Sequence, residues 1–280
     1  MTRAAAALAA AALATLVAAA PAAAQGKHQR YEPYVGQPGK DVIWVPTPDA
    51  VVDRMLKMAG VTPQDLVYDL GAGDGRIAIA AAARFGARAV GIEYDPEMAK
   101  LAQRNAEKAG VAGRVRIVQG DIFATDFTQA TVVALYLLPQ LNMKLRPLLL
   151  AMKPGTRVVS HAFGMEDWKP DETSLVDGRR AYFWVVPADV LGSWTLRAGG
   201  ASADLSFEQK YQQISGSVEL ADKLRGGLRD ARLRGAEIAF SYVDLSGARR
   251  DFTGQVSGHR MEGVYRVGSG PATPWTATKR

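Results

Sequence analysis

The sequence predicts an α/β fold: a mostly parallel sheet with helices on both faces, followed by a smaller antiparallel β module. Short apolar strands alternate with amphipathic helices from about residue 48 to residue 163, and each parallel strand needs such a crossover to return. After Pro187 the helical periodicity vanishes, and apolar and polar side chains alternate, as in residues 238–243. This second pattern is typical of antiparallel strands, and we expect a small sheet or a partial barrel there.

The first helix of the α/β domain is expected directly after Thr47. The stretch Thr47-Pro48-Asp49 combines a capping hydroxyl, a proline at the first helical position and an acid in the first turn, and Gly60 ends the apolar stripe that follows. The remaining elements are expected as strands at residues 66–70, 89–92, 115–118, 131–136 and 156–163, a closing strand at 182–186, and helices at 77–85, 96–109 and 140–152.

The first 24 residues have the layout of a secretory signal peptide. Arg3 precedes an uncharged, alanine-rich run from Ala4 to Ala20, and a stretch of small residues ends at Ala24. Cleavage after Ala24 would leave a mature protein without a stable membrane span, whereas an uncleaved anchor and a structureless tail are the alternatives. The chain is therefore divided into a signal peptide (1–24), an extended arm (25–46), the α/β domain (47–187) and the β module (188–280).

The composition excludes several kinds of chemistry. The 280 residues contain no cysteine, which rules out disulfides, thiolate metal sites and a cysteine nucleophile. The three histidines are too few for a histidine-rich metal site, so no metal is expected. The formal charge of +6 is a mild basic excess, and the arginines of residues 225–234 lie among acids. The β module is therefore expected to present a solvated surface rather than a nucleic-acid groove.

A glycine-rich loop, Asp69 to Gly75, follows the first strand of the expected sheet. Gly71, Gly73 and Gly75 stand at alternate positions, so a ligand can lie against backbone without Cβ atoms and against the start of the next helix. In an open parallel sheet, ligands bind beyond the carboxyl ends of the strands, which is where this loop is placed. A glycine-rich loop alone is a weak indication of function, because many ligands use one.

The charged residues around the loop indicate which ligand it binds. Arg76 stands where a dinucleotide fingerprint requires Gly or Ala, and Asp69 would repel a pyrophosphate but suits the ammonium of a methionine moiety. Glu93 ends the next strand, where a carboxylate can accept both ribose hydroxyls, and Asp121 follows the third, where an adenine amino group would lie. Singly, each acid could instead cap a helix or belong to a turn. Together they predict S-adenosyl-L-methionine (SAM) as the cofactor, with the binding residues Asp69, Gly71, Ala72, Gly73, Asp74, Gly75, Glu93, Asp121 and Ile122.

The same residues carry a family resemblance. The loop from Asp69 to Arg76, followed by Gly91-Ile92-Glu93 and Gly120-Asp121, resembles the motif series of the class I SAM-dependent methyltransferases, which implies their Rossmann-like sheet. Further stretches resemble, more narrowly, bacterial relatives of the ATP synthase c-subunit lysine N-methyltransferase family: Trp44 to Pro48, Tyr136 to Asn142, Arg157 to His161 and Trp168 to Pro170. The narrower resemblance implies methyl transfer to a lysine amine of a protein.

The acceptor site is expected beyond the fourth strand, which is predicted to end at Tyr136. An amine acceptor needs to be oriented and gains from an aromatic wall, so Trp44, Tyr136 and Trp168 are the candidate substrate residues, although each could be an ordinary core residue. Tyr136 and His161 are the candidate catalytic residues, because His161 ends the fifth strand and could take a proton, or could simply bond a neighbouring group. The Asn/Asp-Pro-Pro-Tyr sequence of nucleobase methylation is absent here, so no nucleic-acid substrate is expected.

Three classes of function are compatible with these residues. A methyltransferase acting on a protein amine is favoured, and a small-molecule acceptor is the alternative, because the wall residues do not separate the two. The second class is a SAM-binding module without catalysis, which weak turnover of SAM would reveal. The third is a nucleotide-binding oxidoreductase, which protection by NAD would reveal. Export to the periplasm is expected from residues 1–24, which conflicts with the cytoplasmic synthesis of SAM.

Overall fold

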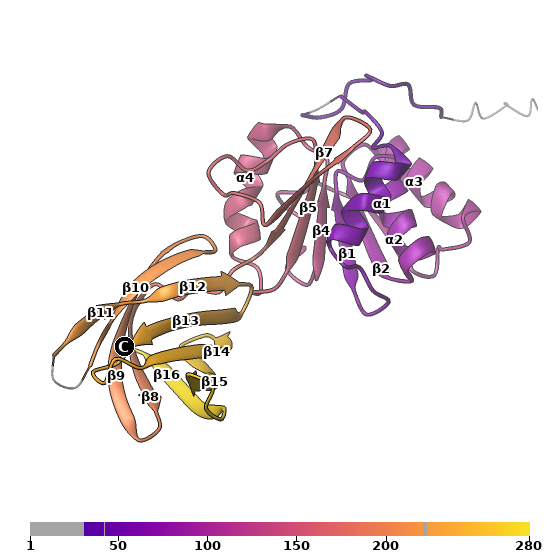
Figure 1. Cartoon of the computed structure of the whole chain (residues 1–280). Coiled ribbons are helices and arrows are strands. Elements are labelled where there is room, and N and C mark those ends of the chain that lie inside the picture. The colour runs from indigo at the N-terminus through magenta and orange to yellow at the C-terminus, as the bar shows by residue number, and fades with distance from the viewer. Residues whose placement is uncertain (1–30, 42, 221–222) are drawn as a thin grey trace, which may run out of the picture. The chain divides into compact units, whose positions relative to one another are not determined.

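The computed structural model describes residues 31–41, 43–220 and 223–280 (Figure 1). The expected signal peptide, residues 1–24, and the first part of the expected arm lie outside the described residues. Residues 33–280 form one unit that contains two separate sheets. Among the residues described, no helix is both long and apolar enough to cross a membrane.

The first sheet has seven strands in the order β3-β2-β1-β4-β5-β7-β6. Strands β1 to β5 are parallel, β7 runs antiparallel to β5, and β6 completes a hairpin at the edge. The strand order reverses between β1 and β4, so the carboxyl ends of these two strands flank the place where an open sheet binds ligands. The strands are Leu66–Leu70 (β1), Arg88–Glu93 (β2), Val115–Gln119 (β3), Val132–Leu135 (β4), Arg157–His161 (β5), Glu172–Val176 (β6) and Arg179–Val185 (β7).

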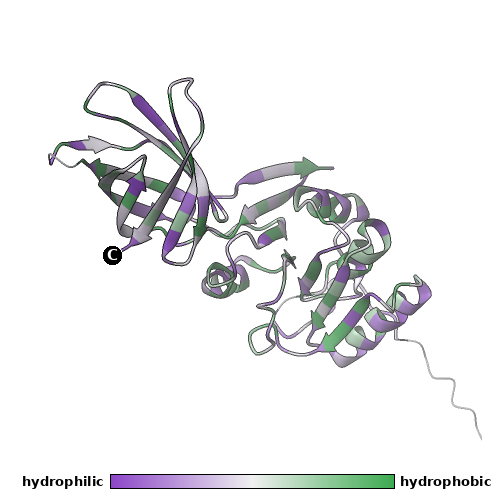
Figure 2. Cartoon of the chain, turned by 90° about the horizontal axis from the view of Figure 1, so that it is seen from below, coloured by the Kyte–Doolittle hydropathy of each residue, from purple (hydrophilic) through white to green (hydrophobic). Residues whose placement is uncertain are grey.

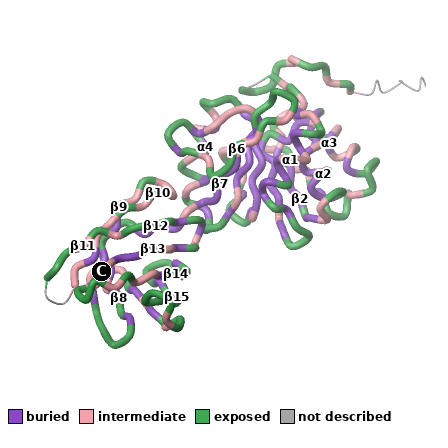
Figure 3. Tube along the Cα trace, viewed as in Figure 1, coloured by how far each residue is buried: buried purple, intermediate pink, exposed green. Residues whose placement is uncertain are grey.

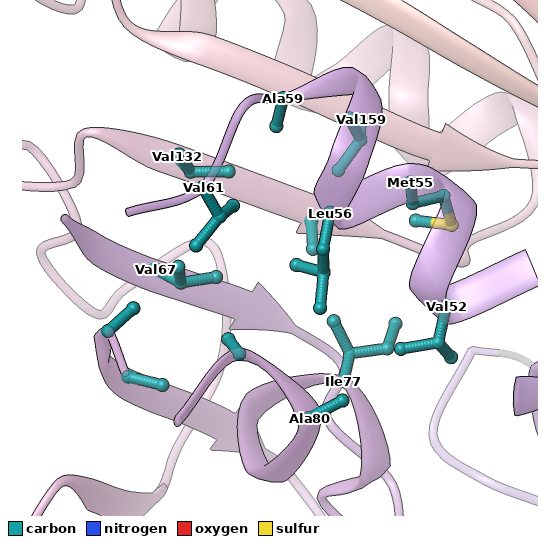
Figure 4. Packing of buried hydrophobic residues seen from close by; sticks show 14 of the residues in the cluster. Val52, Met55, Leu56, Ala59, Val61, Val67, Ile77, Ala80, Val132 and Val159 are labelled. Carbon is teal, nitrogen blue, oxygen red and sulfur yellow. The ribbon is translucent and has the colours of Figure 1, made fainter. Parts of the chain in front are cut away.

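Helices cover both faces of this sheet, as predicted. On one face, α1, α2 and α3 pack over a cluster in which Leu56 meets Val67 and Val159 (Figure 4). On the other face, α4 packs through Leu145 and Leu149. Each such buried aliphatic side chain contributes about 1.5–3 kcal/mol to folding. The helices are Asp49–Met58 (α1), Arg76–Phe85 (α2), Pro96–Lys108 (α3) and Pro139–Leu150 (α4).

The central strands are apolar because both of their faces are covered. All of β4 and all but the first residue of β1 are buried, and the strands of this sheet are largely purple in Figure 3. Apolar residues, green in Figure 2, are concentrated in the same strands, whereas the helices carry hydrophilic stripes. A parallel sheet covered on both faces produces nearly continuous apolar runs of this kind.

Three details differ from the sequence-based expectations. Strand β6 was not expected, since its mostly exposed, polar residues give no apolar signal at a sheet edge. Pro48 rather than Thr47 occupies the N-cap of α1, and no side chain caps that helix. Strand β5 ends at His161, earlier than expected, because Ala162 adopts a left-handed φ of 64° and turns the chain.

The second sheet has nine antiparallel strands in the order β11-β10-β9-β8-β16-β15-β14-β13-β12. Its edge strands β11 and β12 are separated in the chain by Leu228 alone, whose N–H donates to the Gly216 carbonyl, so the sheet curls until its edges nearly meet. Stacked aromatic rings fill it, such as Phe240 and Phe252 with centroids 4.9 Å apart. The expected antiparallel module is confirmed. The strands are Gly192–Ala198 (β8), Ala201–Lys210 (β9), Gln213–Glu219 (β10), Arg225–Gly227 (β11), Arg229–Arg234 (β12), Glu237–Val243 (β13), Arg249–Ser257 (β14), Arg260–Val267 (β15) and Thr273–Lys279 (β16).

Candidate active site

A pocket of about 350 Å³ lies at the carboxyl ends of β1, β2 and β4. This volume is within the range of small-molecule and cofactor sites. The loop after β1, the ends of β2 and β4, the turn after β3, residues 37–41 and 43–46 of the arm, and Thr47 all contribute to its lining. Eight of the nine cofactor residues predicted from the sequence lie in this lining: Asp69, Gly71, Ala72, Gly73, Asp74, Glu93, Asp121 and Ile122.

The ninth predicted cofactor residue, Gly75, has a different place. It is the N-cap of α2, with a φ of 82°, and it does not line the pocket. A Cβ atom at this position would lie 3.1 Å from the Cβ of Ala102, in α3. Gly75 therefore allows α2 to begin and to pack closely against α3, and its contact with the cofactor stays a prediction.

Asp69 is the most unusual group in the pocket. Its side chain is 1% exposed, and its Oδ2 atom has no hydrogen-bond partner among the described residues. Burial is the largest cause of a raised pKa at this carboxyl. With the smaller effects of Asp74 and Glu93, and against the bond from the Ala78 backbone N–H, it raises the pKa to about 7. A buried carboxylate with one oxygen unpaired is costly, so the site favours a cationic ligand that would pair with Oδ2.

Glu93 supports the glycine-rich loop from the neighbouring strand. Its Oε2 accepts from the backbone N–H of Gly73 at 2.8 Å, and its Oε1 accepts from the N–H of Asp95 at 2.9 Å. Burial is the largest influence on the Glu93 carboxyl and raises its pKa, which these backbone donors partly counteract. Each oxygen keeps a second acceptor position, so the predicted ribose contact is compatible with this supporting role.

The arm contributes Lys40, a residue that the sequence did not point to. Lys40 donates to Asp121 Oδ2 at 2.7 Å, and its ammonium lies 4.6 Å from the centre of the Tyr94 ring. The bond from Lys40 is the largest cause of a lowered pKa at Asp121, whose Oδ1 also accepts from the Phe123 N–H. The part of the arm around Lys40 has neither periodicity nor a known motif, so nothing local in the sequence indicated that Lys40 belongs to the pocket.

Trp44, a predicted substrate residue, also comes from the arm. It lines the pocket, and its indole Nε1 lies 2.7 Å from the point where a Cβ atom of Gly73 would be. The arm is fixed locally by paired backbone bonds, in which Gly36 donates to the Trp44 carbonyl and Trp44 donates to the Gln37 carbonyl. Trp44 thus packs directly on the glycine-rich loop.

The acceptor residues predicted from the sequence are only partly brought together. Tyr136 follows β4 and lines the pocket beside Phe163. His161 is 2% exposed and lies against Tyr136, with ring centroids 3.9 Å apart, but it is not part of the lining. Burial, helped by the positive charge of Arg179, lowers the pKa of His161 to about 4, so its imidazole is neutral at pH 7.

Trp168 does not lie at the pocket, in contrast to its prediction as a substrate residue. It is fully buried and packs against Trp184 and Tyr211. Its indole donates to Gln212 Oε1 at 3.0 Å, and its carbonyl accepts from the Trp184 indole. A buried tryptophan needs a partner for its N–H, and here that partner comes from the hairpin between β9 and β10. Trp168 is therefore a core residue that joins the two sheets.

The residues of this pocket fit SAM. The unpaired Asp69 carboxylate suits the ammonium of the methionine moiety, the glycines leave the backbone open to close approach, and Glu93 stands at the end of β2 for the ribose. The sheet order, with β7 antiparallel between β5 and β6, and this arrangement of acids together define a class I SAM-dependent methyltransferase.

Within that class, the chain belongs to the family of the protein-lysine N-methyltransferase of Saccharolobus islandicus (strain REY15A). The two are 50% identical over 138 residues, which are 49% of this chain and 86% of that protein. The family model described as the ANTKMT methyltransferase domain matches residues 69–172.

Two further comparisons agree with the methyltransferase class. The ATP synthase c-subunit lysine N-methyltransferase of Mus musculus is 34% identical over 132 residues, and the chain spans 53% of the length of that protein. The crystal structure of an RNA methyltransferase from Salinibacter ruber, in complex with S-adenosyl-L-homocysteine, is 54% identical with a TM-score of 0.51; the match covers 52% of this chain and 96% of that chain. The cofactor of this enzyme is S-adenosyl-L-methionine.

Proposed function

We propose that this enzyme transfers the methyl group of SAM to the side-chain amine of a lysine in a protein. The relatives from Saccharolobus islandicus and Mus musculus are both named as lysine N-methyltransferases. The observation that carries the proposal is the wall of the pocket beyond β4, formed by Tyr136, Leu138, Leu141 and Phe163. An apolar, aromatic wall fits the aliphatic stem of a lysine, and offers few groups that would read the polar edge of a nucleobase.

The residues of the chain have distinct roles in this proposal. SAM supplies, when bound, an electrophilic methyl group on a sulfonium. Asp69 and the glycine-rich loop hold the methionine and ribose ends, so that the site fixes the direction of transfer. The Tyr136 ring orients the acceptor amine and stabilises the positive charge that it carries after transfer. His161 does not line the pocket, so the acceptor loses its proton to water rather than to this residue.

A labelling experiment tests the proposed acceptor. The purified protein is incubated with SAM that carries a radiolabelled methyl group and with an extract of its own cells, and the label is followed into protein, RNA and small-molecule fractions. Label that enters protein and is released by hydrolysis as methyllysine supports the proposal. Label confined to RNA or to small molecules contradicts it, and protein label on another amino acid contradicts the lysine assignment.

Replacement of Tyr136 with Ala is expected to lower methyl transfer by roughly ten- to a hundredfold, because the acceptor loses both its orientation and a cation–π contact. The affinity for S-adenosylhomocysteine should change by less than about twofold, since the ring forms the acceptor wall. Tyr136→Phe is the matched control and should retain most of the rate, because it keeps the ring. An equal loss of cofactor affinity and turnover in Tyr136→Ala would place this residue in the cofactor pocket instead.

For the location of the enzyme, we propose export to the periplasm on the basis of residues 1–24. Protein substrates of the cell envelope would then be the accessible acceptors. Cell fractionation combined with N-terminal sequencing of the mature protein tests this proposal. A mature protein in the periplasmic fraction that begins at Gln25 supports it, and a cytoplasmic protein that retains Met1 or Thr2 contradicts it.

A further inference from the structure

A series of contacts connects the glycine-rich loop to the acceptor wall, largely along the lining of the pocket. Arg76 donates through Nε and Nη2 to both carboxylate oxygens of Asp74, at 3.0 and 2.6 Å, and through Nη1 to the Thr47 carbonyl at 3.0 Å. The Thr47 hydroxyl lies 3.1 Å from His161 Nδ1. The imidazole of His161 in turn packs on the Tyr136 ring. Of these five residues, Asp74, Arg76, Thr47 and Tyr136 line the pocket, and His161 does not.

Thr47 and His161, in the middle of this series of contacts, are shielded from water. Thr47 is 3% exposed and His161 is 2% exposed, so the bond between them forms without competition from solvent. With the imidazole neutral at pH 7, one ring nitrogen donates and the other accepts, and a hydroxyl can match either state of Nδ1. The bond therefore fixes the rotation of the imidazole, and the imidazole plane in turn limits the rotation of the Tyr136 ring.

The turn after β5 places a second ring near Tyr136. Phe163, which lies at an interplanar angle of 19° to Tyr136, donates from its N–H to the His161 carbonyl at 2.8 Å across the left-handed Ala162. The Ser160 hydroxyl donates to the Phe163 carbonyl at 2.7 Å, and Asn142 of α4 donates to the same carbonyl at 3.3 Å. A strained turn that is fixed by several partly buried bonds is typical of a functional site.

We propose, on the basis of the proposed methyl transfer, that Thr47 and His161 are positioning residues that set the plane of Tyr136 relative to the cofactor loop. His161 lies outside the pocket lining, and Thr47, which is part of the lining, acts on Tyr136 through its bond to His161. Thr47 thereby links the arm, the cofactor loop and the acceptor wall, because its carbonyl holds Arg76 while its hydroxyl holds His161. A displacement of a reacting group by about 1 Å can cost two orders of magnitude in rate, so the fixed plane matters for transfer.

Substitutions at Thr47 test the link without removing a ring. Thr47→Val, which replaces the hydroxyl with a methyl group, is expected to lower kcat roughly tenfold, with the KM for the acceptor and the affinity for S-adenosylhomocysteine changed by less than about twofold. Thr47→Ser keeps the hydroxyl and should restore kcat. Thr156→Val removes another buried threonine hydroxyl, before β5, and should leave kcat unchanged. A kcat that is unaffected by Thr47→Val, or a loss that Thr47→Ser does not restore, overturns the proposal.

Substitutions at His161 distinguish positioning from proton transfer. His161→Phe keeps the packed ring and removes both nitrogens, and should reduce kcat about as much as Thr47→Val while the shape of the pH–rate profile stays that of the wild-type enzyme. If His161 were the base, His161→Phe would abolish the rate and remove a limb of the profile, which would overturn the proposal. The proposal would also be overturned if Thr47→Val and His161→Phe both lowered the thermal unfolding midpoint and the cofactor affinity together. The contacts would then serve only the stability of the fold.

The test of Thr47 and His161 as positioning residues does not depend on which acceptor the enzyme methylates. The kinetic measurements use whichever substrate takes up label from SAM, so methylation of RNA or of a small molecule contradicts the lysine proposal alone. If kcat falls when the Thr47 hydroxyl is removed and returns when Thr47→Ser keeps it, the positioning role is supported with any acceptor.

Discussion

Asp69→Asn is expected to weaken S-adenosylhomocysteine binding at least a hundredfold, roughly 2.7 kcal/mol, while it raises the stability of the cofactor-free protein. The substitution removes a buried anionic partner of the ligand. No group among the described residues bonds Oδ2, so this oxygen is available to the ligand in the wild type. The protein gains because an ionised carboxylate is no longer buried. The two effects have opposite signs, since the group is arranged for the ligand rather than for the fold.

The gain in stability has a definite pH window. Burial raises the pKa of Asp69 from 3.8 to about 7, so the folded protein binds more protons than the unfolded chain between these values. The stability of the wild type relative to Asp69→Asn therefore falls as the pH rises from about 4 to about 7, by about 4 kcal/mol in total. Below pH 4 the difference is absent, and above pH 7 it is constant.

Denaturation of both proteins between pH 4 and pH 8, together with S-adenosylhomocysteine titrations, measures these effects. Asp121→Asn is the matched control, because Asp121 is partly exposed with a lowered pKa, and its neutralisation should not stabilise the protein. Wild-type affinity should also fall below pH 7, by up to tenfold per pH unit, because binding then requires Asp69 to release a proton. Equal stability of wild type and Asp69→Asn at pH 8 would show that the carboxylate is solvated.

Gly73→Val is expected to abolish cofactor binding. Gly73 has a φ of 56°, which a branched residue adopts only at a cost of about 1–2 kcal/mol, and its Cβ would lie 2.7 Å from the Trp44 indole nitrogen. The substituted loop would therefore push the arm away from the pocket and occupy the space of the ligand. Isothermal titration with S-adenosylhomocysteine measures the loss directly.

Gly60 offers a matched control for this substitution. It has the same φ of 56°, but a Cβ there would have no atom within 4 Å. Gly60→Val should therefore reproduce the backbone strain as a loss of stability and retain the cofactor affinity. Binding that survives Gly73→Val would remove the loop from the cofactor site, and a similar loss of binding in Gly60→Val would show that strain alone explains the effect.

The arrangement of strands and helices could be predicted because it depends on local patterns. Apolar runs of β1 and β4 indicated strands buried on both faces, and the expected cap of α3 is confirmed by Asp95, which accepts from the N–H groups of Glu97 and Met98. The loop glycines were predictable for the same reason, since their left-handed backbone is set by residues close in the chain. The β6 hairpin strand was missed because an exposed edge leaves no apolar pattern.

The sequence by itself determined the class I sheet, the antiparallel module and the acids at the ends of the first three strands, because strand period, turn residues and loop spacing act within a few residues. Only the tertiary structure decided which distant groups meet. Lys40 pairs with Asp121, 81 residues away, and Thr47 with His161, 114 residues away. Trp168 lies in the core rather than the pocket because Gln212, 44 residues away, satisfies its indole. Such pairs depend on how irregular segments fold back on the sheet, and no periodic pattern in the chain encodes that path.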